Sequence, residues 1–244
     1  MSTDQNAGRV AVITGASSGI GAATARALAA DGHRVALLAR RADRIHALAD
    51  ELGKGAIAVA ADVTDRDSVV AAAARVQQEL GGADILVNNA GVMLTAPFTS
   101  DQREEHWRMV HTNLLGAMTT TEVFLDQLRT GAGGDLVNIS SVAGRVAPAG
   151  FAAYAATKWG MNGWSEALRV ELQPEIRVMV IEPGAIATEL SDHITHPDSK
   201  KAAKDVLEWA IPPHDIADVI AFAVSRPHRL TLNEILVRPT VQAM

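Results

Sequence analysis

The sequence predicts an α/β fold in which a doubly wound parallel sheet of about seven strands carries helices on both faces. Short β-branched and aliphatic runs alternate with longer Ala- and Leu-rich stretches from Arg9 onward. The apolar runs are continuous, which is typical of strands buried on both faces, and the intervening stretches are long enough for helices. The predicted strands are 9–14, 34–39, 56–61, 84–89, 135–140, 176–182 and 234–238.

Length and composition favour one packed domain over residues 1–244. Hydrophobic residues make up 48% and charged residues 20%, and no apolar run reaches the roughly 18 residues of a membrane span. The chain has no cysteine and its first residues lack an apolar signal region, so we expect a cytoplasmic protein. A net charge of −6 without a dense basic tract argues against nucleic acid and for a small-molecule partner.

A glycine-rich turn, TGASSGIG, joins the first predicted strand to the first predicted helix at Thr14–Gly21. Glycines permit a tight turn and let a pyrophosphate approach the backbone, and the helix N-terminus then attracts the anion. The alternative is a merely tight connection. We favour a Rossmann-type dinucleotide site, with contacts from Gly15, Ser17, Ser18, Gly19, Ile20 and Gly21.

The end of the second strand bears on the choice of cofactor. Ala39 stands where an acidic residue would grip a ribose 2′-hydroxyl, and Arg40 and Arg41 follow directly. Guanidinium groups hold a phosphate through paired, charge-assisted hydrogen bonds, so these residues favour NADP(H) over NAD(H). Solvated arginines at a helix start are the other interpretation.

Polar residues follow the third and fourth strands as Asp62-Val63 and Asn88-Asn89-Ala90-Gly91. Ligands bind at the carboxyl edge of an open α/β sheet, so we expect these residues to meet the adenine and the adjoining ribose. The competing interpretation of Asp62 is a turn or helix cap. The predicted contacts are Asp62, Val63, Asn89, Ala90 and Gly91.

Tyr154 and Lys158 lie four residues apart in a run whose Ala, Leu and Glu content predicts a helix, so they share one face. A tyrosine with pKa about 10 is a poor proton donor near neutral pH, and a nearby ammonium favours the phenolate. Such pairs also occur by chance. Tyr154 is, however, the only tyrosine, and a Ser140-Ser141 pair ends the apolar run just upstream.

Together these segments resemble the short-chain dehydrogenase/reductase family over essentially the whole chain. The matching motifs are TGxxxGxG at Thr14–Gly21, NNAG at Asn88–Gly91, Asn113 in His-Thr-Asn, Ser141 thirteen residues before Tyr154, YxxxK, and PGxxxT at Pro183–Thr188. Within the family the chain looks most like bacterial NADPH-dependent reductases related to clavulanate dehydrogenase, through GASSGIG, TNLLG, SSVAGRV, IEPG, HITH and EILVRPT.

The resemblance implies roles for individual residues. Tyr154 would be the general acid in reduction, Ser141 would hold the substrate carbonyl, and Lys158 would bind ribose and lower the tyrosine pKa. Asn113 would continue a proton relay through water. Ser140 competes with Ser141, whose spacing to Tyr154 matches the family. The implied grip on the nicotinamide comprises Pro183, Gly184, Ile186 and Thr188.

A polar segment at residues 189–211 interrupts the regular alternation and is predicted to form a substrate lid, with a surface helix pair as the alternative. Trp209 is its best pocket candidate. The cluster of Lys200, Lys201 and Lys204 would attract an anionic substrate group if it faced inward, although such clusters are more often solvated. The histidines lack the companion ligands of a recognised metal site, so no metal is expected.

These observations predict an NADPH-dependent oxidoreductase that reduces an aldehyde or ketone and oxidises the matching alcohol at higher pH. A 3-oxoacyl carrier-protein reductase is the alternative within the class, because it shares every catalytic residue. A non-catalytic NADP-sensing module is the alternative from another class. The resemblance also implies a homotetramer or dimer, with Met118 and Trp164 on candidate contact faces.

Overall fold

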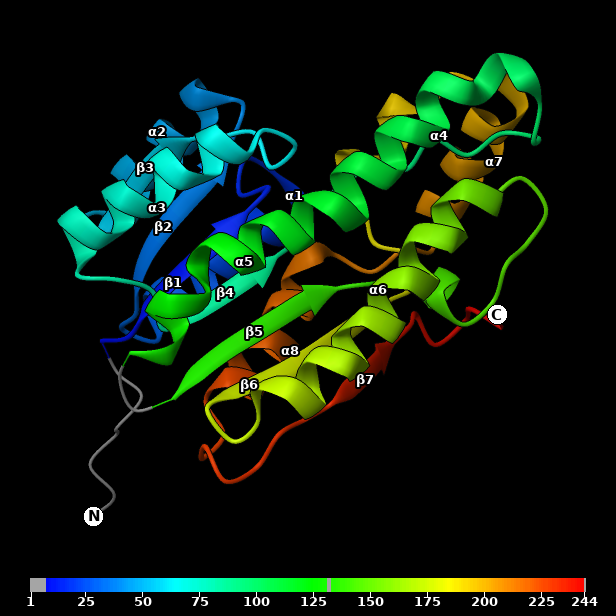
Figure 1. Cartoon of the computed structure of the whole chain (residues 1–244). Coiled ribbons are helices and arrows are strands. Elements are labelled where there is room, and N and C mark those ends of the chain that lie inside the picture. The colour runs from blue at the N-terminus through cyan, green and yellow to red at the C-terminus, as the bar shows by residue number, and fades with distance from the viewer. Residues whose placement is uncertain (1–7, 131–132, 244) are drawn as a thin grey trace.

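The computed structural model describes residues 8–130 and 133–243, and within them it contains all seven predicted strands in one parallel sheet. The sheet order is β3-β2-β1-β4-β5-β6-β7, so the chain reverses its direction of winding between β1 and β4 (Figure 1). The strands are β1 (Val10–Thr14), β2 (Arg34–Ala39), β3 (Ala56–Ala60), β4 (Ile85–Asn88), β5 (Gly134–Ile139), β6 (Ile176–Pro183) and β7 (Glu234–Val237).

Helices cover both faces of the sheet, as predicted. The α-helices are α1 (Gly19–Ala30), α2 (Ala42–Leu52), α3 (Arg66–Leu80), α4 (Arg103–Met109), α5 (Gly116–Arg129), α6 (Ala152–Leu172), α7 (Pro197–Leu207) and α8 (Pro213–Val224). Shorter turns are η1 (Ser100–Gln102), η2 (Val110–Leu115), η3 (Val142–Gly144) and η4 (Glu189–His193).

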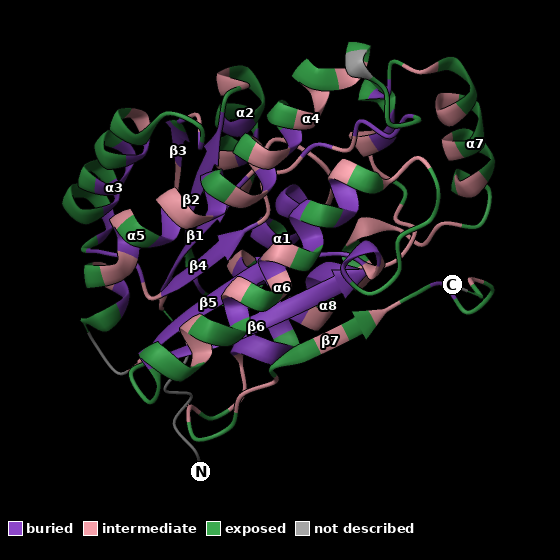
Figure 2. Cartoon of the chain, turned by 45° about the vertical axis from the view of Figure 1, so that its right-hand side comes forward, coloured by how far each residue is buried: buried purple, intermediate pink, exposed green. Residues whose placement is uncertain are grey.

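The core is divided by the sheet into two apolar layers. Ala11 and Ile13 of β1 pack with α1, α2 and α8, whereas Val10 and Val12 pack with α3, α5 and α6. Successive residues of a strand point to opposite faces, so a strand buried on both sides must be apolar throughout. The inner strands are accordingly buried along almost all of their length, whereas the edge strands are not: β3 is only partly buried, and β7 alternates between exposed and half-buried residues (Figure 2).

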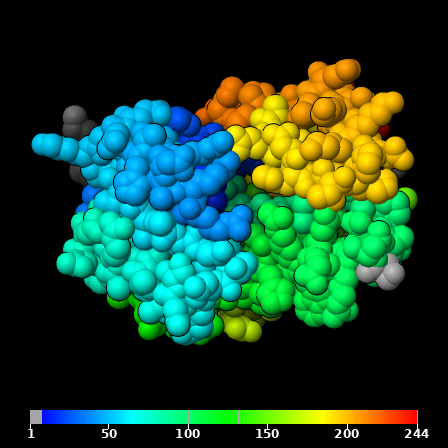
Figure 3. Space-filling view, turned by 90° about the horizontal axis from the view of Figure 1, so that it is seen from above, coloured from blue at the N-terminus to red at the C-terminus, as the bar shows by residue number. Residues whose placement is uncertain are grey.

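The segment at 189–211 forms the short turn η4 and the helix α7. None of the α7 residues is buried, which marks the helix as an outlying element above the carboxyl edge of the sheet. Seen from above, this yellow-to-orange segment lies beside the blue region that holds α2 (Figure 3). Among the residues that the structure describes, no helix is both long and apolar enough to cross a membrane.

Candidate active site

A cleft of about 940 Å³ opens at the carboxyl edge of the sheet, where the chain reverses between β1 and β4. Its size is in the range of ligand sites, and the position is the one at which doubly wound sheets bind ligands. All the predicted cofactor and catalytic residues line it except Gly21 and Asn113, which lie in the layer behind.

At the three glycines of the turn, Gly15, Gly19 and Gly21, there is no room for a side chain. A Cβ on Gly15 would lie 2.9 Å from the Ala90 Cα, and Gly15 and Gly19 have φ of +65° and +54°, in the left-handed region. A Cβ on Gly21 would lie 2.5 Å from both the Asn89 Nδ2 and the Gly15 oxygen. The turn therefore leaves a bare backbone cradle in front of the α1 N-terminus, which fits a pyrophosphate.

Asn89 and Thr14 hold this cradle in shape. The Asn89 Nδ2 donates to the carbonyl oxygens of Thr14 at 2.9 Å and Gly15 at 3.3 Å. The Thr14 hydroxyl oxygen accepts the backbone N–H groups of Asn89 and Ala90, both at 3.0 Å. The predicted contact residue Asn89 thus lines the cleft and also ties the β4 loop to the turn.

The expectation that Asn88 meets the cofactor is wrong. Its side chain is buried beneath the cleft, where Nδ2 donates to the Thr121 hydroxyl at 2.8 Å and to the Asn138 Oδ1 at 2.9 Å. Asn88 shares a face of β4 with Leu86, which belongs to the apolar layer under α3 and α5. Alternation along the strand therefore turns it away from the ligand side.

Two arginines stand at the end of the cleft where the second strand finishes. The Arg41 Nη2 donates to the hydroxyls of Ser17 at 2.8 Å and Ser18 at 2.7 Å. Arg40 is more exposed, and its Nη1 lies 3.9 Å from Asp62 Oδ2. Cations and hydroxyl groups therefore converge at the position predicted for a 2′-phosphate.

Asp62 shapes a turn and also lines the cleft. Its Oδ1 accepts the Thr64 backbone N–H at 3.0 Å and the Thr64 hydroxyl at 2.7 Å, which forms the turn after β3. Burial works against ionisation, but these hydrogen bonds and the Arg40 charge hold the pKa of Asp62 below its ordinary value. The carboxylate also lines the cleft beside Arg40, so its place in the turn does not exclude a contact with a ligand.

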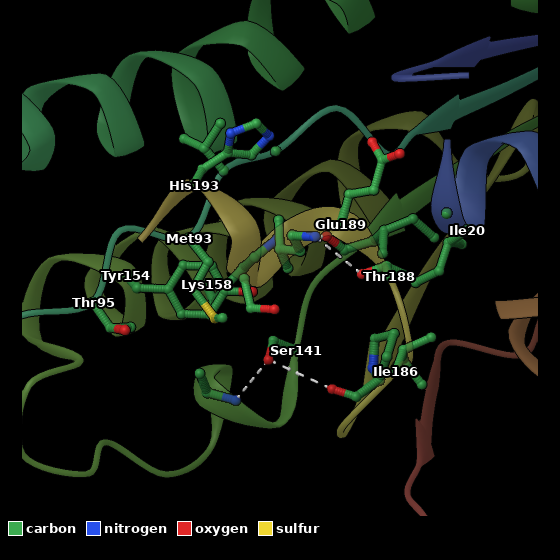
Figure 4. A pocket seen from close by; sticks show the side chains of 18 of the residues that line it. Ile20, Met93, Thr95, Ser141, Tyr154, Lys158, Ile186, Thr188, Glu189 and His193 are labelled. Carbon is green, nitrogen blue, oxygen red and sulfur yellow. Dashed lines mark hydrogen bonds between the residues drawn. The ribbon is translucent and has the colours of Figure 1, made fainter. Parts of the chain in front are cut away.

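Tyr154, Lys158 and Ser141 come together at the other end of the cleft (Figure 4). The α6 helix places Lys158 one turn after Tyr154, with its Nζ 5.7 Å from the phenol ring centroid. The same Nζ donates to the Ile139 carbonyl oxygen at 2.8 Å. Both side chains are buried, so the predicted i, i+4 pair is present and desolvated.

The electrostatics of the pair differ from our expectation. Burial raises the pKa of Tyr154 to about 12, although a hydrogen bond with Ser141 works in the lowering direction. Burial also lowers the pKa of Lys158 to about 8. Desolvation outweighs the hydrogen bond with Ser141, so the pKa of the tyrosine is not lowered.

Ser141, not Ser140, is the serine that reaches Tyr154. Its hydroxyl caps η3 by accepting the Ala143 N–H at 3.1 Å, and it contacts the Pro183 carbonyl oxygen at 3.5 Å. The Ser140 hydroxyl instead points to the Lys158 carbonyl oxygen at 3.4 Å. The directions of the two hydroxyl groups therefore favour Ser141 over Ser140 as the partner of Tyr154.

Asn113 lies in η2, a π-helical turn between α4 and α5. Single π turns within helices often occur at functional sites. Its Oδ1 accepts the Val92 N–H at 2.8 Å, and its Nδ2 donates to the Val92 carbonyl oxygen at 2.9 Å. The buried side chain, whose Nδ2 also donates to the Thr157 hydroxyl at 3.2 Å, is thus committed to fixing the loop after β4.

The predicted nicotinamide grip forms the wall opposite α1. Pro183, Gly184, Ile186 and Thr188 all line the cleft. The Thr188 hydroxyl caps η4, and its methyl group would lie 3.0 Å from a Cβ on Gly19. This close approach brings the β6 loop against the glycine turn, as a bound dinucleotide requires.

At the substrate end, the predicted segment 189–211 and its pocket candidate Trp209 both contribute to the lining of the cleft, whereas the other walls had no signal in the sequence. Its walls are largely apolar, and Met93 and His193 are among the residues that line it (Figure 4). From α7, the residues that line the cleft are Ser199, Ala202, Ala203, Val206 and Leu207, followed by Trp209. Lys200, Lys201 and Lys204 do not line it, so the solvated interpretation of that cluster is the better one.

A metal centre is not found in the part of the chain that the structure describes. No three His, Asp or Glu side chains of residues 8–130 and 133–243 gather as ligands would. His193 and His196 are instead parts of the segment beside the cleft, and His196 caps α7 by accepting the Ser199 N–H.

A glycine-rich turn at the carboxyl edge of the sheet and a buried Ser141, Tyr154 and Lys158 cluster share one cleft, an arrangement that fits an oxidoreductase of the doubly wound α/β class. The chain belongs to the short-chain dehydrogenase family, whose profile matches residues 9–199.

Similar proteins extend the match over nearly the whole chain. An uncharacterized oxidoreductase of Mycobacterium tuberculosis is 42% identical over 96% of this chain and 92% of its own length. One from Staphylococcus saprophyticus is 35% identical over 97% and 98%. Among solved structures, the closed form of a serine dehydrogenase complexed with NADP+ has a TM-score of 0.90 at 30% identity, covering 96% of each chain. An alcohol dehydrogenase from the archaeon Thermococcus sibiricus, complexed with 5-hydroxy-NADP, has 0.86 at 32%, covering 97% and 98%.

Proposed function

We propose that this protein is an NADPH-dependent reductase that converts an aldehyde or ketone to an alcohol, with alcohol oxidation as the reverse reaction. The observation that carries the proposal is the meeting of Ser141, Tyr154 and Lys158 in one buried corner of the cleft that holds the glycine cradle. The NADP complexes of two similar structures support the choice of cofactor.

The residues at the adenosine end fit NADP(H). The cradle fits the pyrophosphate because Gly15, Gly19 and Gly21 add no Cβ atoms to it. The donors for a 2′-phosphate would be Arg40, Arg41, Ser17 and Ser18. Pro183, Gly184, Ile186 and Thr188 would hold the nicotinamide end. When bound, the reduced nicotinamide supplies a hydride to the carbonyl carbon.

The protein's own residues handle the oxygen and the proton. Ser141 and Tyr154 donate hydrogen bonds to the carbonyl oxygen, and Tyr154 then gives that oxygen its proton. A phenol whose pKa is about 12 is fully protonated at neutral pH, which is the state that reduction needs. Lys158, with a pKa of about 8, is charged at that pH and stabilises the phenolate left behind. Asn113 would continue the proton relay through water, as the family resemblance implies.

The finer assignments rest on the same cleft. Residues 189–211 would act as a lid, since the apolar side of α7 lines the cleft and the lysines lie outside it. The apolar wall favours a carbonyl compound with an apolar body.

Four further statements stay predictions. They are the kinship with reductases of the clavulanate dehydrogenase type, the single domain over 1–244, the cytoplasmic location and the homotetramer or dimer. On α7, Asp198 and Asp205 flank the three lysines, so this helix gives the acyl-carrier alternative no uniformly basic docking face.

A panel of aldehydes and ketones, followed by the loss of NADPH absorbance, tests the proposal. We expect turnover with at least one apolar carbonyl compound, and at least about a thousandfold less with the same compound when Tyr154→Phe replaces the wild-type protein. Tight NADPH binding without turnover of any carbonyl compound, including 3-oxoacyl carrier-protein substrates, would support the non-catalytic sensing module instead.

A further inference from the structure

Glu189, the first residue of η4, reaches across the cofactor cleft to the arginines beyond the second strand. Its Oε2 lies 2.8 Å from Arg41 Nη1, and its Oε1 accepts from Arg44 Nη1 at 2.7 Å. These residues are separated by nearly 150 positions of sequence, and the pairing joins the start of the lid segment to the start of α2. Figure 4 shows the Glu189 side chain directed away from the Ser141 end of the cleft.

One partner of Glu189, Arg41, lines the cleft and is the group that a 2′-phosphate would use, and Arg44 shares the same carboxylate. Arg41 bonds the hydroxyl oxygens of Ser17 and Ser18, and each hydroxyl keeps its own hydrogen to donate to an anion. The Glu189 carboxylate supplies the negative charge between two guanidinium groups that a phosphate would otherwise supply. Hydrogen bonds from Arg41 and then Arg44 lower the pKa of Glu189 to about 2, so the carboxylate is ionised throughout the neutral range.

The ion pairs are weak enough to exchange. The side chains of Arg41, Arg44 and Glu189 are 39%, 44% and 41% exposed. Exposed pairs contribute little to stability because water and salt screen them. A doubly charged phosphate can therefore take the guanidinium groups from a singly charged carboxylate, at the cost of releasing Glu189.

We propose that Glu189 is a specificity-determining residue that competes with the 2′-phosphate of NADP(H) for Arg41 and Arg44, and that Arg44 is a further phosphate ligand. This inference rests on the NADP(H) preference given in the proposed function. It follows that the carboxylate weakens binding of NADPH without affecting NADH, which lacks the phosphate. Displacement of Glu189 also frees the start of the lid when the phosphate arrives.

Isothermal titration of the full-length protein with NADPH and with NADH tests the competition. Glu189→Gln keeps the shape of the side chain and removes its charge. We expect the NADPH dissociation constant to fall about three- to fivefold and the NADH constant to stay unchanged. Arg44→Ala should raise the NADPH constant about threefold or more, again without a change for NADH. Glu208→Gln, at the exposed end of α7, is the matched control and should alter neither constant.

Two results would overturn the inference. If Glu189→Gln weakens NADPH and NADH alike, the residue clamps the cleft shut over either cofactor and does not compete with the phosphate. If it leaves NADPH binding unchanged, the carboxylate does not share the phosphate's ligands. Equal affinity of the wild-type protein for NADH and NADPH would contradict the proposed cofactor preference, whereas the ratio of the Glu189→Gln effects on the two cofactors would still decide the role of Glu189.

Discussion

The ammonium of Lys158 lies 5.7 Å from the ring centroid of Tyr154, and both side chains are almost entirely removed from solvent. Burial penalises each charged form, so the pKa of the tyrosine rises and that of the lysine falls. The buried ammonium of Lys158 therefore lowers the free energy of unfolding. The proposed chemistry gives a reason for retaining it.

Lys158→Met should make the protein more stable near neutral pH while abolishing function. The lysine pKa is lowered from 10.5 to about 8 on folding, so below pH 8 the buried ammonium carries its full penalty. As pH rises from 8 to 10.5 the folded protein releases the proton before the unfolded chain does, so the penalty disappears. We expect a gain of about 1–3 kcal/mol at pH 7, reduced by the lost bond to Ile139, and shrinking toward pH 9.5.

Urea titrations of both proteins at pH 7 and pH 9.5 measure this difference. A stability gain that grows with pH would contradict the assignment of a buried, charged Lys158. In activity assays, Lys158→Ala should weaken both turnover and NADPH binding, because the lysine would serve the ribose and the tyrosine together.

Cofactor choice should follow the residues after β2. Changing Ala39→Asp and Arg40→Ala together should raise the Michaelis constant for NADPH by up to about two or three powers of ten, if 3–4 kcal/mol of phosphate contact is lost. Arg41→Ala alone should cost more than Arg40→Ala alone, because Arg41 is held by Ser17 and Ser18 whereas Arg40 is largely exposed. Steady-state kinetics with NADPH and NADH test both statements. Equal use of the two cofactors by the wild-type enzyme would refute the assignment.

Two glycine-to-alanine changes should act in opposite directions. Gly21→Ala would place a Cβ 2.5 Å from Asn89 Nδ2 and from the Gly15 oxygen, so we expect a loss of about 1–3 kcal/mol and weaker NADPH binding. Gly163→Ala, in the interior of α6, meets nothing within 4 Å and should stabilise the protein by about 0.5–1 kcal/mol. Thermal melts with and without NADPH compare them, and equal melting temperatures for the two variants would contradict the cradle described for the turn.

Association into a dimer or tetramer is expected from the family resemblance, with faces near Met118 and Trp164 as contacts. The C-terminal run from Glu234 is a further candidate for the interface. Light scattering at micromolar concentration measures the mass directly. A single species of 25.7 kDa would show that this expectation is wrong.

The sequence was sufficient for the sheet and for most of the cleft, because each depended on local signals. Continuous apolar runs identified every strand, and the four-residue spacing placed Lys158 over Tyr154. Asn88 was misjudged although the alternation along β4, which sets it beside Leu86 and opposite Val87, carried the necessary information. The pairing of Glu189 with Arg44 had no local signal, since it depends on how η4 and α2 meet in space. The burial that reverses the expected tyrosine pKa is likewise a property of the packed fold.

The most direct test of the account is Tyr154→Phe, which removes the chain's only phenol and keeps the ring. Packing with Phe151, whose ring meets Tyr154 edge-on, should be preserved, so any loss reports proton transfer and the hydrogen bond to the carbonyl oxygen. We predict that turnover falls at least about a thousandfold, while the NADPH dissociation constant measured by fluorescence stays within about tenfold. Retention of more than about a tenth of wild-type turnover, on a substrate for which chemistry is rate-limiting, would contradict the role assigned to Tyr154.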